Sequence, residues 1–257
     1  MDETYQAYVN RVARLTLPAT YQSQLENLQA SPKFVAGQAV AFPGFSAISP
    51  PYQDDSDNGT FYGELARYQQ QLLDSLGEVA TAVPVASFHL TLADLIWDSD
   101  YRAVVQENPQ FDEQLQQRVG ESFHQCQPLL KGGDPVCWQV LGIMLRPRAI
   151  ALCLVPQNES SYEKVLQVRR SIYQNAAVIA LGIEQQYHFT AHITMAYFSQ
   201  SGANLDSQRL SEALMSLNDQ FLLREALVLR VKRVELRKFD DMTLYYRKAD
   251  WPVLFFE

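Results

Sequence analysis

Cysteine and histidine are scarce in this sequence, which has three cysteines and four histidines among its 257 residues. The cysteines are odd in number, widely spaced and without a Cys-x-x-Cys pair, so no disulfide framework is indicated. We interpret Cys126, Cys137 and Cys153 as reduced, buried thiols of a cytosolic protein rather than as functional groups. With so few histidines, any pattern among them is informative.

Basic residues are in the minority, since 21 lysines and arginines stand against 29 aspartates and glutamates, for a formal net charge of −8. Long nucleic acids are bound through clustered basic side chains, so this acidic chain is not expected to bind them. A small phosphate-bearing ligand in one local pocket is compatible with the charge. The sequence gives no evidence of a required protein partner.

Long apolar runs are absent, because none approaches the roughly 20 residues that a membrane span needs. The opening segment MDETYQAYVNRVARL lacks the basic start and apolar centre of a secretion signal. We therefore expect a cytoplasmic protein that has no membrane partner. Apolar residues make up 47% of the chain and charged residues 19%, which is the composition of a globular protein with a sizeable core.

Three of the four histidines are followed, two positions later, by one of only nine threonines. Random placement would produce this spacing less than once in a chain of this length. It occurs once in HLTLAD, which begins at His89, and twice in HFTAHITMAY, which begins at His188. HLTLAD and HITMAY share the order His, apolar, Thr, apolar, Ala and begin 103 positions apart.

Periodic segments and turn signals divide the chain into three parts. Residues 1–33 are predicted to be a helical N-terminal extension, residues 34–146 a first lobe with HLTL, and residues 147–257 a second lobe with HITM, all within one compact domain. Each lobe runs in the order strand, helix, motif strand, helix, strand, which indicates a duplicated unit rather than a short repeat. Equivalent strands of a duplicated unit lie near a pseudo-twofold axis, so we expect the two motif strands to converge.

Both motifs lie in segments rich in β-branched and aromatic residues, VPVASFHLTLADLIW and YHFTAHITMAYF, which we predict to be strands. Side chains alternate faces along a strand, so His89 and Thr91 point to one side, as do His192 and Thr194. Two such strands would present two imidazoles and two hydroxyls to one cleft. Histidine serves as acid or base near neutral pH and threonine donates to phosphoryl oxygens, which is what phosphodiester cleavage needs.

A metal site is the main competing interpretation, because His188 and His192 have the i, i+4 spacing of helical zinc motifs. On a strand, these two residues lie about 13 Å apart at ~3.3 Å per residue, which is too far for one ion. Neither HLTL nor HITM contains an aspartate or glutamate that could help to hold a cation. We therefore predict a site without a metal or another cofactor.

His192 matches His89 better than His188 does, because a large apolar residue follows the threonine in HITM whereas alanine follows it in HFTA. His188 and Thr190 share the face of His192 on the predicted strand. They either extend the cleft wall and contact the substrate, or serve the structure alone. Four basic residues at strand ends are interpreted as solvated cations rather than phosphate ligands: Arg146, Arg148, Arg237 and Lys238.

The HLTL and HITM tetrapeptides, one in each half of the chain, resemble the paired motifs of the 2H phosphoesterase superfamily, over roughly residues 34–250. This superfamily includes RNA 2′,3′-cyclic phosphodiesterases and 2′-5′ RNA ligase-like proteins. The resemblance implies an α+β, bilobal fold in which two mainly antiparallel sheets, flanked by helices, surround a central cleft. It further implies that His89 and His192 form an acid–base pair, and that Thr91 and Thr194 bind the phosphate, without a metal.

The leading hypothesis is a metal-independent phosphodiesterase that hydrolyses a 2′,3′-cyclic phosphate, or a related phosphodiester, of a small nucleotide or an RNA end. One histidine would act as base on water and the other as acid on the ribose oxygen, and either assignment is compatible with the sequence. The alternative is a non-catalytic module that binds a nucleotide or phosphorylated ligand in the same cleft. RNA end-joining or long-RNA processing fits less well with the acidic charge.

Overall fold

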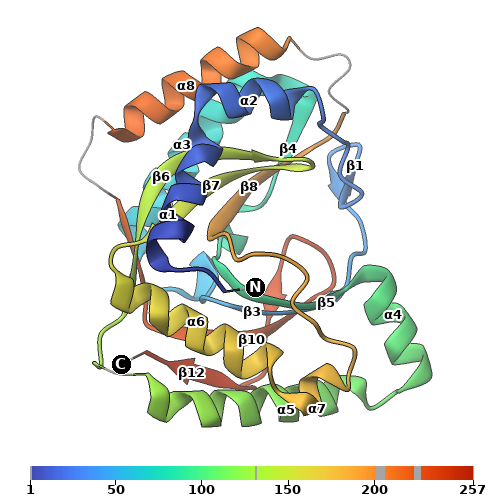
Figure 1. Ribbon diagram of the computed structural model, residues 1–257. Helices are drawn as coiled ribbons and strands as arrows, with labels where there is room; N and C mark the ends of the chain where they lie inside the picture. Colours follow the sequence, from blue (N-terminus) through green and yellow to red (C-terminus); the bar gives the residue numbers. More distant parts are fainter. Residues whose placement is uncertain (1, 131, 201–205, 223–226, 257) are drawn as a thin grey trace.

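The computed structural model describes residues 2–130, 132–200, 206–222 and 227–256 (Figure 1). Its α-helices, in chain order, are α1 (Tyr5–Ala13), α2 (Pro18–Leu25), α3 (Gly59–Leu76), α4 (Asp98–Glu107), α5 (Phe111–Cys126), α6 (Glu159–Tyr173), α7 (Ala176–Ile179) and α8 (Ser207–Leu222). Its strands are β1 (Phe34–Val35), β2 (Gln38–Ala39), β3 (Gly44–Ile48), β4 (Ala80–Ala82), β5 (Thr91–Trp97), β6 (Val136–Arg146), β7 (Ala149–Pro156), β8 (His192–Phe198), β9 (Val228–Val231), β10 (Arg233–Phe239), β11 (Tyr245–Tyr246) and β12 (Val253–Phe255).

Two five-stranded sheets organise these elements, together with a small pair formed by β1 and β2. The first sheet, called the β3–β5 sheet below, has the order β11-β10-β3-β5, and β12 also pairs with β10. The second, called the β7–β8 sheet, has the order β4-β8-β7-β6-β9. All the strand pairings described are antiparallel. The predicted α+β class, with antiparallel sheets flanked by helices, is confirmed.

Each sheet takes strands from both halves of the chain. In the β3–β5 sheet, β10 from the second half pairs with β3. In the β7–β8 sheet, β4 from the first half pairs with β8. The division predicted between residues 146 and 147 falls in the turn that joins β6 to β7, and these two strands are paired neighbours. It therefore does not separate the two sheets, because each sheet is completed by strands from the other half.

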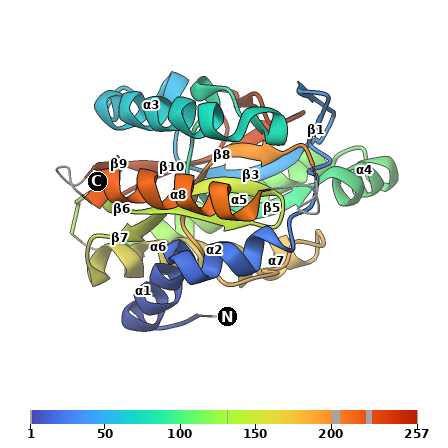
Figure 2. The ribbon, with the colours of Figure 1, turned by 90° about the horizontal axis from the view of Figure 1, so that it is seen from above.

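Helices cover the outer faces of both sheets, as Figures 1 and 2 show from two directions. α2, α3 and α8 pack on the β7–β8 sheet, where they contact β6 and β4. α4, α5 and α6 pack on the β3–β5 sheet, where they contact β5 and β12. Among the helices of the described residues, none has the length and apolar character needed to cross a membrane.

Helices α1 and α2 lie within the segment predicted to be an N-terminal helical extension, and both are built into the fold. Tyr8 of α1 and Tyr21 of α2 are fully buried. Their hydroxyls donate to backbone carbonyls of the β7–β8 sheet, Tyr8 to Leu154 at 3.3 Å and Tyr21 to Ile143 at 2.5 Å. Burial together with these bonds holds α1 against β7, which pairs with the motif strand β8, and α2 against β6.

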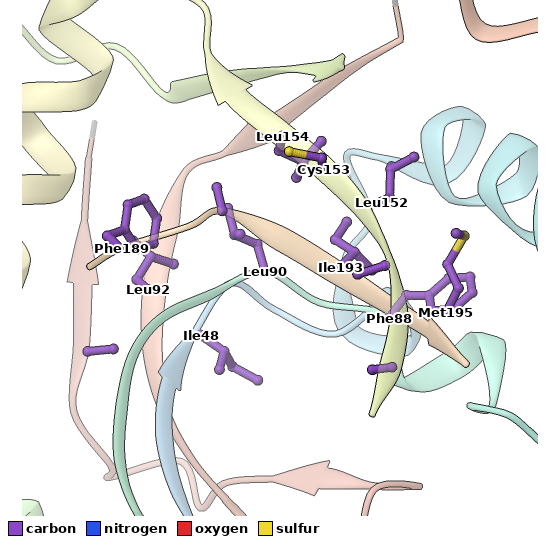
Figure 3. Packing of buried hydrophobic residues seen from close by; sticks show 14 of the residues in the cluster. Ile48, Phe88, Leu90, Leu92, Leu152, Cys153, Leu154, Phe189, Ile193 and Met195 are labelled. Atoms are coloured by element: carbon purple, nitrogen blue, oxygen red, sulfur yellow. The ribbon is translucent and has the colours of Figure 1, made fainter. Parts of the chain in front are cut away.

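Leu90 and Ile193, the apolar residues between the His and Thr of each motif, are fully buried. They belong to one continuous hydrophobic cluster, and Figure 3 shows them with Phe88 and Met195 among its packed side chains. Full burial of a side chain of this size contributes about 1.5–3 kcal/mol. This burial holds the histidine and threonine of each motif on the opposite side of the chain, as the predicted alternation requires.

A β-bulge follows the threonine in each motif strand. The extra residue is Leu92 in β5 and Met195 in β8, the fourth residue of each motif. A bulge adds one residue to its strand and so shifts the alternation of faces by one position. As a result, Asp94 and Tyr197, the sixth residues of the two motifs, join the histidines and threonines on the wall of one cavity.

The carbonyl of each bulged residue accepts a hydrogen bond from a buried polar side chain of a helix. Arg169 of α6 donates to the carbonyl of Leu92. Gln69 of α3 donates to the carbonyls of Met195 at 2.7 Å and Val83 at 2.8 Å. Each helix thus supports the motif strand that belongs to the other half of the chain. A buried carbonyl without a donor is costly, so these bonds stabilise the bulges.

Replacing Gln69 with leucine should lower the free energy of unfolding by about 1–3 kcal/mol, because two buried carbonyls lose a donor while the side-chain volume is kept. Equilibrium unfolding in denaturant measures the change. Gln70→Leu, at the exposed neighbouring position of the same helix, should change stability by no more than about 0.5 kcal/mol. Equal losses in the two variants would contradict the role given to Gln69.

Candidate active site

A cavity of about 580 Å³ lies between the two sheets, with walls contributed by both. Its size is within the usual range of small-molecule sites. His89, Thr91, His192 and Thr194 all line it. The fold therefore brings the two motifs to one cavity, although they are 103 positions apart in the sequence.

His89 lies just before β5, where the short 3-10 helix Val85–Ser87 leads into the strand. Its Nδ1 is 2.7 Å from the carbonyl oxygen of Ser87. A carbonyl can only accept, so Nδ1 donates this bond and Nε2 keeps the free lone pair of the neutral ring. The ring of Tyr245 packs against the imidazole, with their centroids 4.1 Å apart. These two contacts fix both the tautomer and the orientation of His89.

His192, the first residue of β8, repeats this arrangement. Its Nδ1 is 2.8 Å from the carbonyl oxygen of Thr190, again two positions before the histidine. The two imidazoles therefore have the same tautomer, in which Nδ1 is occupied and Nε2 is available for proton transfer. A histidine pair in this state can accept a proton at one Nε2 and donate from the other once that ring is protonated.

Burial lowers the pKa of both imidazoles, to about 4 for His89 and about 3 for His192. Positive charges act in the same direction: Arg237 and Lys33 for His89, and Arg146 and Lys33 for His192. Burial and neighbouring cations both disfavour the charged imidazolium. Both rings are therefore neutral at pH 7, which is the state of a general base.

Three basic side chains line the cavity, Lys33, Arg146 and Arg148. Within the described part of the chain, none of them forms an ion pair with a carboxylate. Lys33 donates to the Tyr197 hydroxyl at 3.2 Å, which directs its ammonium group toward the second motif. Arg146 and Arg148, interpreted from the sequence as solvated cations, both belong to the cavity wall, where Arg146 is partly buried and Arg148 is exposed. The cavity is thus locally cationic in an acidic protein.

Arg237 and Lys238 are ion-paired away from the cavity wall. Arg237 is buried and donates to Asp54 at 2.6 Å, and Lys238 donates to Asp112 at 2.6 Å. They are paired structural cations rather than the solvated ones expected from the sequence. Arg237 still influences the site through space, since its charge lowers the pKa of His89.

His188 and Thr190 lie in an irregular segment, because β8 begins only at His192 and the strand predicted over 187–198 is shorter. The side chain of His188 is exposed, and neither residue lines the cavity. The Thr190 hydroxyl accepts a hydrogen bond from Arg11 at 2.9 Å. Within the described residues, no three His, Cys, Asp or Glu side chains form a group that could hold a metal ion.

Sequence reasoning did not single out several residues of the cavity wall, among them Lys33, Asp94 and Tyr197. Asp94 and Tyr197 were detectable in principle, because they are the two differing residues at the end of the aligned HLTLAD and HITMAY. Strict alternation from His89 and His192 would turn them to the opposite face, and the bulges bring them to the cavity side. Lys33 has no local signal, because its position depends on how the segment after α2 packs against the β7–β8 sheet.

No family model and no curated protein matches the sequence. A solved structure of a conserved protein of unknown function from Agrobacterium tumefaciens is similar, with a TM-score of 0.61 and 15% identity, covering 88% of this chain and 91% of that chain. Two further similar structures are a phosphoesterase (TM-score 0.34, 13% identity, 84% and 93% covered) and E. coli LigT complexed with 3′-AMP (TM-score 0.35, 14% identity, 83% and 92% covered). At these identities, the likeness to the Agrobacterium structure concerns the fold alone.

The lowered pKa values predict that folding stability decreases in acid through the two histidines. An unfolded histidine has a pKa near ~6.5, so below that pH the unfolded chain binds protons that the native chain does not. This contribution is complete above pH ~6.5 and is lost as the pH falls toward the folded values of about 4 and about 3. Unfolding free energies measured from pH 7 to 4.5 should fall less steeply in His89→Gln and His192→Gln than in the parent protein. Parallel slopes in all three proteins would refute this.

Proposed function

We propose that this protein is a metal-independent phosphodiesterase of the 2H type, which hydrolyses a 2′,3′-cyclic phosphate, or a related phosphodiester, of a small nucleotide or an RNA end. The observation that carries the proposal is the pair of imidazoles. Each has Nδ1 bonded to the carbonyl two residues before it, and both line one cavity together with a threonine from the same motif. The resemblance of HLTL and HITM to the paired superfamily motifs supports the same assignment.

The reaction divides between the two histidines. The Nε2 of one imidazole takes a proton from water as the water oxygen attacks phosphorus. The bond from phosphorus to one ribose oxygen breaks, and the imidazolium of the other histidine gives that oxygen its proton. For a cyclic phosphate, the product is a nucleoside monophosphate in which that ribose oxygen is now a free hydroxyl. One proton has moved onto the first histidine and one off the second, so exchange of protons with solvent restores the pair.

The cationic side chains explain how one neutral histidine becomes an acid. Lys33 and Arg146 lower the pKa of His192, and Lys33 also lowers that of His89. An anionic phosphate bound beside these cations offsets their charge, so the pKa of the neighbouring imidazole rises. Substrate binding therefore favours the protonated state that the leaving oxygen requires. Thr91 and Thr194 add neutral donors for the phosphoryl oxygens.

The size and charge of the protein favour a compact ligand. A cavity of about 580 Å³ accommodates a nucleotide, while the net charge of −8 disfavours a long polyanion. The local cations Lys33, Arg146 and Arg148 supply the attraction where the phosphate binds. We therefore propose nucleoside cyclic phosphates or RNA ends, rather than internal RNA, as substrates.

His89→Ala and His192→Ala should each lower kcat/KM for a 2′,3′-cyclic nucleotide by at least about 100-fold, because each removes a general acid or base. Product formation followed by mass, with EDTA present throughout, measures the effect. The parent enzyme should keep its activity in EDTA and show a bell-shaped pH profile.

His188→Ala is the matched control, because this exposed histidine lies outside the cavity wall and should leave kcat/KM unchanged. If the parent protein binds the cyclic nucleotide but does not consume it, the phosphodiesterase proposal is wrong and the alternative of a non-catalytic binding module holds. Full turnover in either cavity variant would rule out the paired-histidine mechanism.

Lys33→Met should raise KM for the same substrate about tenfold or more, because a hydrogen bond to a charged group is lost. The same change removes a positive charge that lowers the pKa of both imidazoles, so the acid limb of the pH–rate profile should move to higher pH. Steady-state kinetics from pH ~3 to 9 test both effects, because the acid limb depends on imidazoles with pKa values of about 4 and about 3. Lys248→Met, at an exposed position, is the control. An unchanged KM would remove Lys33 from the phosphate site.

A further inference from the structure

Asp94 is a carboxylate on the wall of a cavity otherwise suited to anions. The bulge at Leu92 turns it to the cavity side of β5, three residues beyond Thr91. Its carboxylate accepts hydrogen bonds from the Tyr187 hydroxyl and, at 3.5 Å, from Ser46. Its backbone carbonyl accepts from Tyr173 at 2.7 Å. The side chain is therefore held in place by elements on several sides.

The charge of Asp94 is not neutralised by direct pairing. No lysine or arginine of the described residues forms an ion pair with it. Burial raises its pKa, while Lys33, Arg146 and Arg169 act at longer range in the opposite direction. An ionised carboxylate has about four acceptor sites, and the protein fills two of them. The remaining acceptor capacity is available to donors of a bound molecule.

Two aromatic side chains line the same part of the cavity. Trp97 is three residues further along β5 and is half-buried. Tyr187 reaches the cavity from the segment before β8 and keeps 40% of its surface exposed, while its hydroxyl binds Asp94. Aromatic faces stack on nucleobases of any kind. A fixed acceptor beside two aromatic rings is the composition of a base-binding subsite.

The spacing along β5 matches a nucleotide. Thr91, which we propose binds the phosphate, and Asp94 pair with Ile48 and Ser46, which are two positions apart on β3, or about 7 Å at ~3.3 Å per residue. A ribose and a base can span that separation. In the second motif, the equivalent residue is Tyr197, which instead holds Lys33. The duplicated strands thus differ at this position, with a cation anchored in one half and an acceptor in the other.

We propose that Asp94, flanked by Trp97 and Tyr187, reads the hydrogen-bonding edge of the substrate base and prefers guanine; this rests on the proposed function. Guanine presents two adjacent N–H donors, N1–H and N2–H, which match the two oxygens of a carboxylate. Adenine and cytosine place an amino group beside an acceptor nitrogen, which a carboxylate repels. Uracil places its one N–H between two carbonyl oxygens. The expected order of affinity is therefore guanine first and uracil last.

The test measures binding of the four nucleoside 3′-monophosphates to the full chain by isothermal titration, so that it does not depend on turnover. The parent protein should bind the guanosine compound about tenfold more tightly than the uridine compound, as one bidentate pair predicts. Asp94→Asn keeps the shape but loses the second acceptor, so it should weaken guanosine binding about tenfold and leave uridine binding nearly unchanged. Asp74→Asn, on the exposed face of α3, is the matched control and should behave as the parent.

Tyr187→Phe is a second, milder variant that keeps the ring and removes the hydroxyl that holds Asp94, so it should reduce the guanosine preference in part. Equal weakening of all four nucleotides by Asp94→Asn, or no base preference in the parent, would overturn the inference. Absence of binding by all four would overturn it as well. A guanosine preference without cleavage of cyclic nucleotides would contradict only the proposed function. Cleavage without a base preference would contradict only this inference.

Discussion

Two hydrogen bonds from imidazole to backbone govern the chemistry of the cavity. The Nδ1 atoms of His89 and His192 are bonded to the carbonyls of Ser87 and Thr190, which leaves the Nε2 of each ring available for proton transfer. Because both acceptors are backbone atoms two residues upstream, the path of the main chain into each strand sets the tautomer. A shift of register by one residue would turn the histidine to the opposite face and remove it from the cavity.

The exchange of elements between the two halves makes the site a property of the complete fold. β10 completes the β3–β5 sheet and β4 completes the β7–β8 sheet. In the same way, Arg169 of α6 supports the bulge of the first motif, and Gln69 of α3 supports that of the second. Neither half by itself therefore supplies the side-chain donor that supports the bulge in its own motif strand. The bulges that turn Asp94 and Tyr197 into the cavity depend on this mutual support.

Charge is organised on two scales in this protein. The chain as a whole is acidic, with a net charge of −8, yet the cavity collects Lys33, Arg146 and Arg148 on its wall. Net charge acts at long range and influences solubility and encounter, whereas a bound phosphate responds to cations within a few ångströms. The acidic exterior and the cationic cavity together favour a small anion. Within the cavity, Asp94 places a carboxylate acceptor on the same wall as these cations.

The sequence by itself determined which side chains are candidates for the chemistry and that the histidine and threonine of each motif share one face, because alternation and residue type are local properties. Leu90 and Ile193 are buried as that alternation required. Only the tertiary structure decided the rest. The bulges arise from pairing with strands distant in sequence, Lys33 reaches the cavity through the packing of α2, and His188 is excluded because β8 begins at His192. Register and packing are set by partners elsewhere in the chain, which no local pattern records.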